Sequence, residues 1–238
     1  MFNFEVMSHP TGSVGTVNGV MVGVVSNNDD PDKLGRVKLK FALYEEEMES
    51  DWAPIASLMS GNDMGTLFIP EVGDHVLVAF HLGHLSKPYV IGSLWHNKAK
   101  PPAKADKNDI RKIHTRSGHE LIFDDKKGEE SITLKTSKGV QVILDDKSDK
   151  VSIGTKNDQQ KIILAGGTAG TITVETSGNK VTISKMGDIQ IESKKSVTIK
   201  STQLKLEASA SMDIKANAAL NIQSSGMLTL KGAMAKIN

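Results

Sequence analysis

The chain has 238 residues and no cysteine, and its 29 lysines and arginines nearly balance its 28 aspartates and glutamates. It can therefore form no disulfide bond, thiol nucleophile or cysteine-ligated zinc site, and the near-neutral charge argues against a general nucleic-acid binder. No apolar run approaches the length of a membrane span and the first residues lack a basic start followed by an apolar stretch, so we expect neither a transmembrane helix nor a secretory signal peptide.

Composition divides the chain near Pro102. All seven prolines lie at or before this residue, and all seven histidines lie at or before His119. Residues 1–102 hold 7 basic and 12 acidic residues, whereas residues 103–238 hold 22 basic and 16 acidic residues. A shift of this size indicates two domains. The expected linker is residues 98–109, because its adjacent prolines forbid a helix and the rest of it is polar.

Residues 17–97 are expected to form a small β barrel. Short alternating or apolar runs, separated by turn-forming Asn, Asp, Gly and Pro residues, indicate its strands. These runs occupy residues 20–25, 36–41, 76–80 and 89–94. About eighty residues is a suitable length for a five-stranded OB barrel. The acidic run at residues 45–51 could bind cations or a basic partner, but a solvated loop is expected.

Residues 110–238 contain a repeat, which is clearest from Ile189 onward. Its unit is an apolar–x–apolar triplet, and the first members of the last six triplets are 8, 7, 8, 8 and 8 residues apart. These triplets are Ile189/Ile191, Val197/Ile199, Leu204/Leu206, Met212/Ile214, Leu220/Ile222 and Leu228/Leu230. Looser copies of the same triplet precede them. Each triplet predicts a short strand with two side chains facing a core, so the domain is expected to be a β-helix or solenoid.

Two arrangements can stabilise strands that offer only two apolar side chains each. One chain can coil on itself with three repeats per turn, or three chains can interlock into one triangular prism. The repeat pattern by itself leaves both open. The prism would pair almost every backbone group, and twelve units at about 4.8 Å per layer would span on the order of 60 Å. Charged residues become rare and turn residues become small after Glu207, which is typical of a narrowing needle.

Three motifs could carry chemistry, and each has a simpler structural interpretation. His81 and His84 could be two metal ligands, but no third ligand follows at a suitable spacing, so a solvated loop is expected. Asp74 and His75 lack an accompanying serine elbow or cysteine. The glycine-rich residues 166–170 lack the Gly-Lys-Ser/Thr ending of a phosphate loop and are expected to be a turn between strands.

Three segments of the first domain resemble those of a known family. They are residues 23–39, residues 52–56 with 65–80, and residues 87–95. In this order they are similar to the OB domain of the spike proteins of contractile injection machines. That family includes phage baseplate assembly protein V, the VgrG proteins of type VI secretion and the spikes of extracellular phage-tail-like particles. The repeat of the second domain resembles the family's trimeric β-helix.

The resemblance implies an all-β protein, with an N-terminal OB-fold barrel at residues 17–97 and an intertwined, triple-stranded, homotrimeric β-helix needle at residues 110–238. It implies a structural, non-enzymatic central spike at the tip of the inner tube of a phage tail, tailocin or extracellular injection particle. Such a spike contacts the target envelope mechanically and uses no catalytic residue, metal, cofactor or specific nucleic acid. It is made in the cytoplasm without a signal peptide and is extracellular or virion-associated after assembly.

Departures from the family pattern narrow the expected partners. VgrG proteins usually carry a large hub domain before the OB domain, so a separate trimeric hub protein is expected here, and residues 1–16 are an extension that could contact it. The short linker leaves no room for a lysozyme domain. Because no histidine follows His119, a tip that binds its own iron is not expected, and a PAAR-type protein is expected to cap the needle. The expected cap contacts are Met234, Ala235, Lys236, Ile237 and Asn238.

Two other classes of function compete with the spike. One alternative is a β-helical surface-binding protein or a glycan-active enzyme, and the other is an OB-fold nucleic-acid binder. Glycan enzymes need paired carboxylates or basic residues clustered on one face, whereas the repeats show scattered, alternating charges. An OB-fold nucleic-acid binder needs a basic groove with stacking aromatics, whereas the first domain has an excess of acidic residues.

Overall fold

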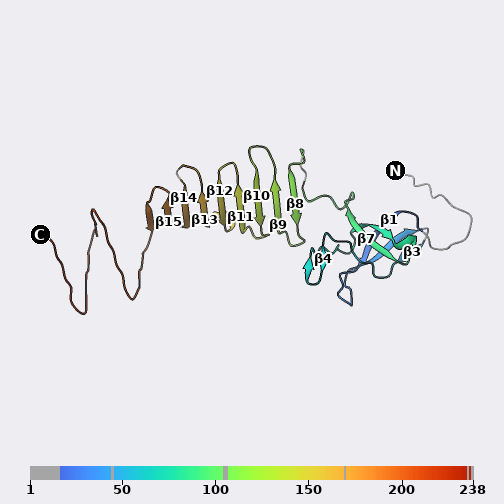
Figure 1. Cartoon of the computed structure of the whole chain (residues 1–238), viewed down its shortest axis with the longest axis horizontal. Helices are drawn as coiled ribbons and strands as arrows, with labels where there is room; N and C mark the ends of the chain where they lie inside the picture. The colour runs from blue at the N-terminus through green and yellow to red at the C-terminus, as the bar shows by residue number, and fades with distance from the viewer. Residues whose placement is uncertain (1–16, 44–45, 104–106, 169, 235, 237–238) are drawn as a thin grey trace, which may run out of the picture. The chain divides into compact units, whose positions relative to one another are not determined.

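The computed structural model describes residues 17–43, 46–103, 107–168, 170–234 and 236 (Figure 1). The chain divides into two compact units, Met1–Glu192 and Ser193–Asn238, and the first unit contains two large β-sheets. The described residues form no α-helix and two 3-10 turns, η1 at His81–Gly83 and η2 at Lys156–Asp158. The expected all-β class is confirmed, while the predicted domain bounds stay predictions. Residues 1–16, predicted to contact a hub, lie outside the described part.

The first sheet has five antiparallel strands in the order β3-β2-β1-β6-β7. These strands are β1 Val20–Asn27, β2 Lys38–Leu43, β3 Glu46–Glu49, β6 His75–Phe80 and β7 Pro88–Leu94. A separate hairpin joins β4 Ser60–Gly61 to β5 Met64–Gly65. The four runs expected to be strands therefore correspond to β1, β2, β6 and β7.

A short segment between β3 and β4 links the two sides of this sheet. Ala53 exchanges two backbone hydrogen bonds with Val37, next to β2. Ile55 forms a parallel bridge with Val90 in β7, and the Ala56 N–H donates to the Val90 carbonyl. One segment thus contacts both β2 and β7, and this contact closes the five strands into a barrel consistent with an OB fold.

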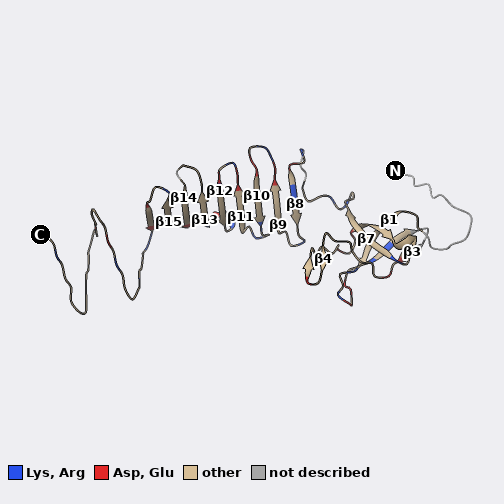
Figure 2. Cartoon of the chain, viewed as in Figure 1, with Lys and Arg blue, Asp and Glu red and all other residues tan. Residues whose placement is uncertain are grey.

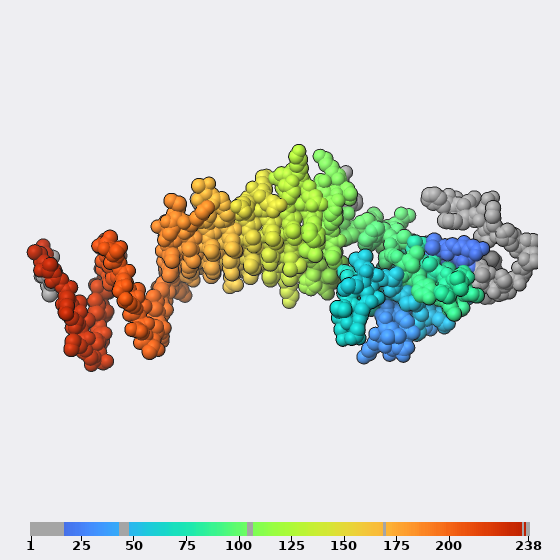
Figure 3. All heavy atoms as spheres, in the orientation of Figure 1, coloured from blue at the N-terminus to red at the C-terminus, as the bar shows by residue number. Residues whose placement is uncertain are grey.

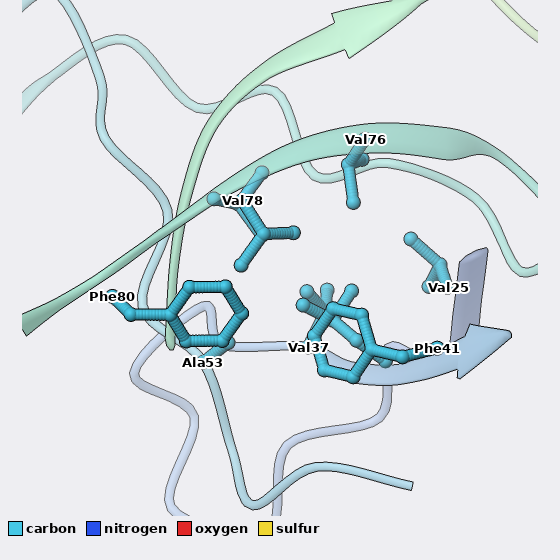
Figure 4. Close-up of a cluster of buried hydrophobic side chains, with 9 residues drawn as sticks. Val25, Val37, Phe41, Ala53, Val76, Val78 and Phe80 are labelled. Carbon is cyan, nitrogen blue, oxygen red and sulfur yellow. The ribbon is translucent and has the colours of Figure 1, made fainter. Parts of the chain in front are cut away.

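The interior of the barrel holds one cluster of buried apolar side chains (Figure 4). Along β6 the exposure alternates, because successive side chains of a strand point to opposite faces, and Val76, Val78 and Phe80 are the buried set. Phe41 packs against Phe80, with 5.8 Å between ring centroids. A Cβ on Gly23 would lie 3.1 Å from the Phe41 ring, so glycine at this position lets β1 approach that ring.

The acidic run at residues 45–51 was expected to be a solvated loop, and this prediction is wrong for four of its residues. Glu46–Glu49 form β3 and pair with β2, with Met48 opposite Phe41. Glu49 accepts hydrogen bonds from the Ser26 hydroxyl at 2.8 Å and from the Lys38 ammonium at 3.2 Å. Glutamate has a low strand propensity, and here these partners and the edge pairing with β2 outweigh it.

The second sheet has nine strands, which pair in chain order from β8 to β16. They are β8 Ile110–His114, β9 Glu120–Asp124, β10 Ser131–Lys135, β11 Gln141–Asp145, β12 Lys150–Gly154, β13 Gln160–Ala165, β14 Thr171–Thr176, β15 Asn179–Ser184 and β16 Ile189–Ser193. Every strand pair from β8 to β15 is antiparallel, so this sheet is a meander.

Tight turns explain why the chain reverses between these strands. At the end of β8, the Gly118 N–H donates to the Thr115 carbonyl, and Gly118 has φ +82°, a conformation that glycine adopts without strain. Gly139 with φ +88° makes the equivalent turn after β10. Because consecutive strands fold back on each other, this part of the chain does not coil on itself with three repeats per turn.

The second unit differs from the meander. Residues 194–234 form no strand in the described part, and all of them are exposed. Bends recur about every eight residues and separate straight limbs, which Figure 3 shows as a single zigzag. These bends fall at residues 194–195, 202, 209–210, 217–218, 225–226 and 233. The limbs therefore carry the predicted triplets, but within one chain they have no strand partners.

Candidate functional site, an uncovered apolar sheet face

Two rows of apolar side chains run across one face of the meander. They arise because the two apolar residues of each triplet lie opposite those of the next strand in the observed registers. One row contains Phe123, Ile132, Leu144, Val151, Leu164, Ile172 and Ile183. The other contains Leu121, Leu134, Val142, Ile153, Ile162, Val174 and Val181.

Both rows are open to solvent in a single chain. Most of their large side chains keep between 36% of their surface exposed, at Val181, and 55%, at Leu134, while Leu121, Val142 and Val151 are half-buried. Single exposed apolar residues are ordinary on protein surfaces, but a contiguous apolar face marks an interaction site. Full burial of one such side chain contributes about 1.5–3 kcal/mol. A partner that covered both rows would therefore gain a large driving force for association.

The opposite face of the meander is better shielded. The middle row of this face consists of β-branched or small residues, and Thr173 in that row is only 8% exposed. Long side chains at the strand ends flank this row, including Lys161 and Glu175, whose charged atoms lie 3.6 Å apart. Lysine and glutamate stems cover neighbouring surface while their charges stay in water. The two faces are therefore chemically different, and only one of them lacks cover.

Ion pairs across the strands keep that shielded face soluble. Lys112 in β8 donates a hydrogen bond to Glu120 in β9, and less than a fifth of the surface of each side chain is exposed. The Lys112 ammonium is the main cause that lowers the pKa of Glu120. Figure 2 shows both blue and red residues along this sheet. Mixed charges of this kind are typical of a solvated surface.

A groove of about 620 Å³ lies along one apolar row. Leu144, Val151, Leu164, Ile172 and Ile183 line its apolar side. Turn residues line the other side, where the Asp149 carbonyl accepts a hydrogen bond from the Gly166 N–H at 2.8 Å. The groove is thus part of the uncovered face, and its lining suits the apolar edge of another sheet.

The residues predicted to contact a tip cap are only partly described. Met234 is 87% exposed, and Lys236 is also exposed. Ala235, Ile237 and Asn238 lie outside the described residues. The assignment of these five residues to a cap therefore stays a prediction.

In the barrel, one loop is held by a buried carboxylate. The Asp30 side chain is 3% exposed and accepts two hydrogen bonds from the Arg36 guanidinium, at 2.7 and 2.9 Å. It also accepts from the backbone N–H groups of Asp32, Leu34 and Arg36. Arg36 is the main cause that holds the pKa of Asp30 well below its usual range. These contacts explain the Asp-Pro-x-x-x-Gly-Arg pattern within the first segment of the family resemblance.

An exposed apolar surface that was not predicted from the sequence lies beside the β4–β5 hairpin. Leu58 is 96% exposed and Leu67 is 80% exposed, and Met64 and Phe68 are also open. The backbone of this hairpin leaves no room for a side chain at Gly65, because a Cβ there would lie 2.2 Å from the Met59 carbonyl oxygen. The apolar run at residues 67–69 was the signal available in the sequence.

The motifs considered for chemistry take structural positions. His81 is the first residue of the turn η1 and His84 follows its last residue, and the His84 N–H donates to the His81 carbonyl. Asp74 accepts the Glu71 N–H in the turn before β6, and the His75 ring stacks on His96 at 4.0 Å. Residues 166–170 form the turn between β13 and β14, as expected, with residue 169 outside the described part.

Within the described part of the chain, no group of three or more His, Asp or Glu side chains is arranged to hold a metal ion. Among the same residues, no helix combines the length and hydropathy that crossing a membrane requires.

Residues 21–95 match the family model of the type VI secretion system/phage-baseplate injector OB domain. The first domain is therefore similar to injector OB domains, and a repetitive β-structure follows it in the chain. The chain is also 30% identical over 138 residues to the type VI secretion system spike protein VgrG5 of Pseudomonas aeruginosa, covering 53% of this chain and 18% of that protein. The predicted resemblance to VgrG-like baseplate and spike proteins is confirmed.

Two further relatives come from Vibrio cholerae. The type VI secretion system spike protein VgrG3 is 32% identical over 117 residues, which is 45% of this chain and 12% of that protein. The actin cross-linking toxin VgrG1 is 27% identical over 136 residues, which is 51% of this chain and 12% of that protein. The chain thus spans less than a fifth of the length of these curated relatives.

Proposed function

We propose that the protein is a structural, non-enzymatic central spike of a contractile injection machine. Three copies join through the uncovered face of the meander and enclose its two apolar rows. The observation that carries this proposal is a domain similar to injector OB domains, followed by a sheet whose apolar face has no cover among the described residues. Two of the relatives to which the chain is similar are named as type VI secretion system spike proteins, which supports the same role.

The width of the strands favours three copies. Two inward side chains at positions i and i+2 lie about 7 Å apart along a strand, so each sheet face is narrow. Three narrow faces can meet around one axis and bury both rows of each. The groove beside Leu164 and Ile172 then receives the sheet edge of a neighbouring copy.

The proposed partners come from the family resemblance. A separate hub protein binds the OB end, and a PAAR-type protein caps the C-terminal end around Met234 and Lys236. The assembled particle is a phage tail, tailocin or extracellular injection particle, and the spike contacts the target envelope mechanically. A shared sheet interior and extensive backbone pairing suit such a load, since rupture requires many hydrogen bonds to break together.

The alternative is a β-helical surface-binding protein or glycan-active enzyme. The toxin name of one relative shows that spike proteins can accompany an activity, although only 12% of that relative is matched here. The uncovered apolar face favours assembly over this alternative, because a glycan-binding surface is polar and open to solvent.

The molar mass in solution tests the proposal. Multi-angle light scattering of the purified full chain, before and after mild detergent, should give a mass of three chains in both conditions. A persistent monomer would contradict the spike function. In a second step, an in-frame deletion of the gene should abolish killing or delivery by the machine, and only the trimeric wild-type protein should restore it.

A further inference from the structure

The outer face of the barrel at β1, β6 and β7 is apolar. Val76 and Val78 point into the core (Figure 4), so the alternate residues of β6 face outwards. Strand pairing arranges the outward residues in three rows, each with one residue from each of the three strands. The rows are Val20, Ala79 and Tyr89; Val22, Leu77 and Gly92; and Val24, His75 and Leu94. None of these residues is an aspartate, glutamate, lysine or arginine.

This outer face is open among the described residues of the chain. Val20 is 54% exposed and Val22 is 50% exposed, and Tyr89 and Leu94 are also exposed. Gly92 leaves room above the middle row, because a Cβ there would meet no heavy atom within 4 Å beyond its chain neighbours. A contiguous apolar face marks an interaction site, and a glycine within a strand permits close approach of another segment.

The chain enters the barrel at one end of this face. Val17 is the first described residue, and its N–H donates to the Gly83 carbonyl at 2.7 Å, in the turn η1 that follows β6. Val20, three residues later, begins β1 and belongs to the first row. Residues 1–16 lie outside the described part, and the point at which they join the barrel is beside this row.

The first residues of the sequence match the face in pattern and in reach. Phe2, Phe4 and Val6 alternate with other residues. Alternate side chains of an extended segment lie on one side about 7 Å apart, which is also the spacing of the three rows along β6. The nine residues 8–16, which include two glycines and a proline, can span up to about 30 Å. This span exceeds the length of about 13 Å that the three rows cover.

We propose that residues 2–6 lie as an extended segment on the outer face of β1, β6 and β7 and cover its three apolar rows. Phe4 is the middle apolar residue, so its ring lies on the middle row beside Gly92 whichever way the segment runs. Asn3 and Glu5 face water. A partner that uses this face has to displace the segment. The inference does not depend on the proposed spike function or on the number of copies.

Cysteine labelling tests the proposal, because the natural chain has no cysteine. Val22→Cys places one thiol in the middle row, and mass spectrometry of the full chain measures its rate of reaction with a maleimide. Adding Phe2→Ser/Phe4→Ser should increase this rate at least about tenfold, since the burial energy of one phenylalanine corresponds to such a factor. The matched control Asn3→Ser/Glu5→Ser alters the other side of the segment and should leave the rate unchanged.

A second thiol position distinguishes this face from the other exposed apolar surface of the barrel. Met64→Cys places the thiol on the β4–β5 hairpin, and its labelling rate should not respond to Phe2→Ser/Phe4→Ser. A response at Met64→Cys and none at Val22→Cys would overturn the proposal in favour of the hairpin surface. Fast labelling of Val22→Cys in every background would show an open face. Slow labelling in every background would show another occupant, and a rate that falls with protein concentration would identify it as a second copy. Both results would overturn the proposal, and the mass measured by light scattering would still decide the proposed function independently.

Hydrogen exchange keeps the inference testable if Val22→Cys does not fold. In the otherwise natural full chain, Phe2→Ser/Phe4→Ser should accelerate exchange of the backbone amides of β1 and β7, because removing the cover lowers the cost of local opening. Amides of the meander from β8 to β15 should exchange as before. Equal exchange of β1 and β7 with and without the two phenylalanines would overturn the proposal.

Discussion

Asp30 shows how a single side chain fixes the conformation of a loop. Its carboxylate receives the Arg36 guanidinium and three backbone N–H groups of the chain between the two residues. A buried carboxylate that loses its charge leaves these donors with a weaker acceptor and leaves Arg36 uncompensated. The loop before β2 therefore depends on one ionised group.

The substitution Asp30→Asn should destabilise the OB domain selectively. Both tryptophans, Trp52 and Trp95, belong to this domain, so their fluorescence reports its unfolding alone. We expect the fluorescence transition to move down by at least about 5 °C. Asp32→Asn is the matched control, because Asp32 lies at the surface and accepts from Arg36 only. An equal shift in both variants would contradict a special role for Asp30.

The same carboxylate should make OB-domain stability depend on pH. The folded pKa of Asp30 is lowered, so its contribution is complete above the unfolded pKa of about 3.9 and is lost as the pH falls below that value. Glu49 affects the pH dependence of stability in the same direction. Its pKa is also lowered, mainly by the hydrogen bond from the Ser26 hydroxyl and then by that from Lys38. Urea titrations followed by tryptophan fluorescence should therefore show constant stability from pH 5 to 7 and a decrease below about pH 4. The decrease should be shallower in Asp30→Asn than in Asp32→Asn.

At the scale of the element, the meander shows how register creates a surface. Each strand contributes only two apolar side chains, which cannot form a core alone. Hairpin pairing places Leu164 opposite Ile172 and Val151, and the same alignment repeats from β9 to β15. A slip of one residue would move every apolar side chain to the other face, so the observed registers concentrate them on one side.

A charge placed in that face should prevent assembly. Leu164→Glu would put an unpaired carboxylate into the apolar interior of the trimer, where an isolated charge is strongly unfavourable. We expect a monomer by light scattering. Ser152→Glu introduces the same charge on the shielded face of the neighbouring strand β12 and should remain trimeric. Loss of the trimer in both variants would show that the face does not decide association.

At the scale of the whole molecule, two kinds of stability coexist in one chain. The OB domain has its own buried core within a single chain. The apolar rows of the meander are exposed unless copies associate. Their stability therefore depends on assembly, and so on protein concentration.

Heating should consequently give two separate transitions. Tryptophan fluorescence should report a first transition that does not change with protein concentration. Far-ultraviolet circular dichroism should report a second transition at higher temperature, which rises when the concentration is raised tenfold. Unheated samples should also resist dissociation by detergent during electrophoresis. A single transition that coincides in both signals would contradict the division into an independent domain and a shared one.

The sequence by itself determined the all-β class, four strands of the OB barrel and the apolar triplets, because alternation and turn residues are local properties of the chain. The family resemblance rested on segments such as Asp30 to Arg36, whose contacts are also local. The strand β3 escaped prediction, since pairing with β2 and the partners of Glu49 outweigh the low strand propensity of glutamate.

Only the tertiary structure decided how the triplets are used. The triplet spacing is compatible with coils or hairpins, since both keep two side chains on one face. Hydrogen bonds between consecutive strands select an antiparallel meander from β8 to β15, and the registers align Ile162 with Val174 and Ile153. The resulting face has no cover within the described residues of one chain. Such pairing depends on contacts between strands and not on the pattern within one strand, so the triplet spacing alone does not determine it.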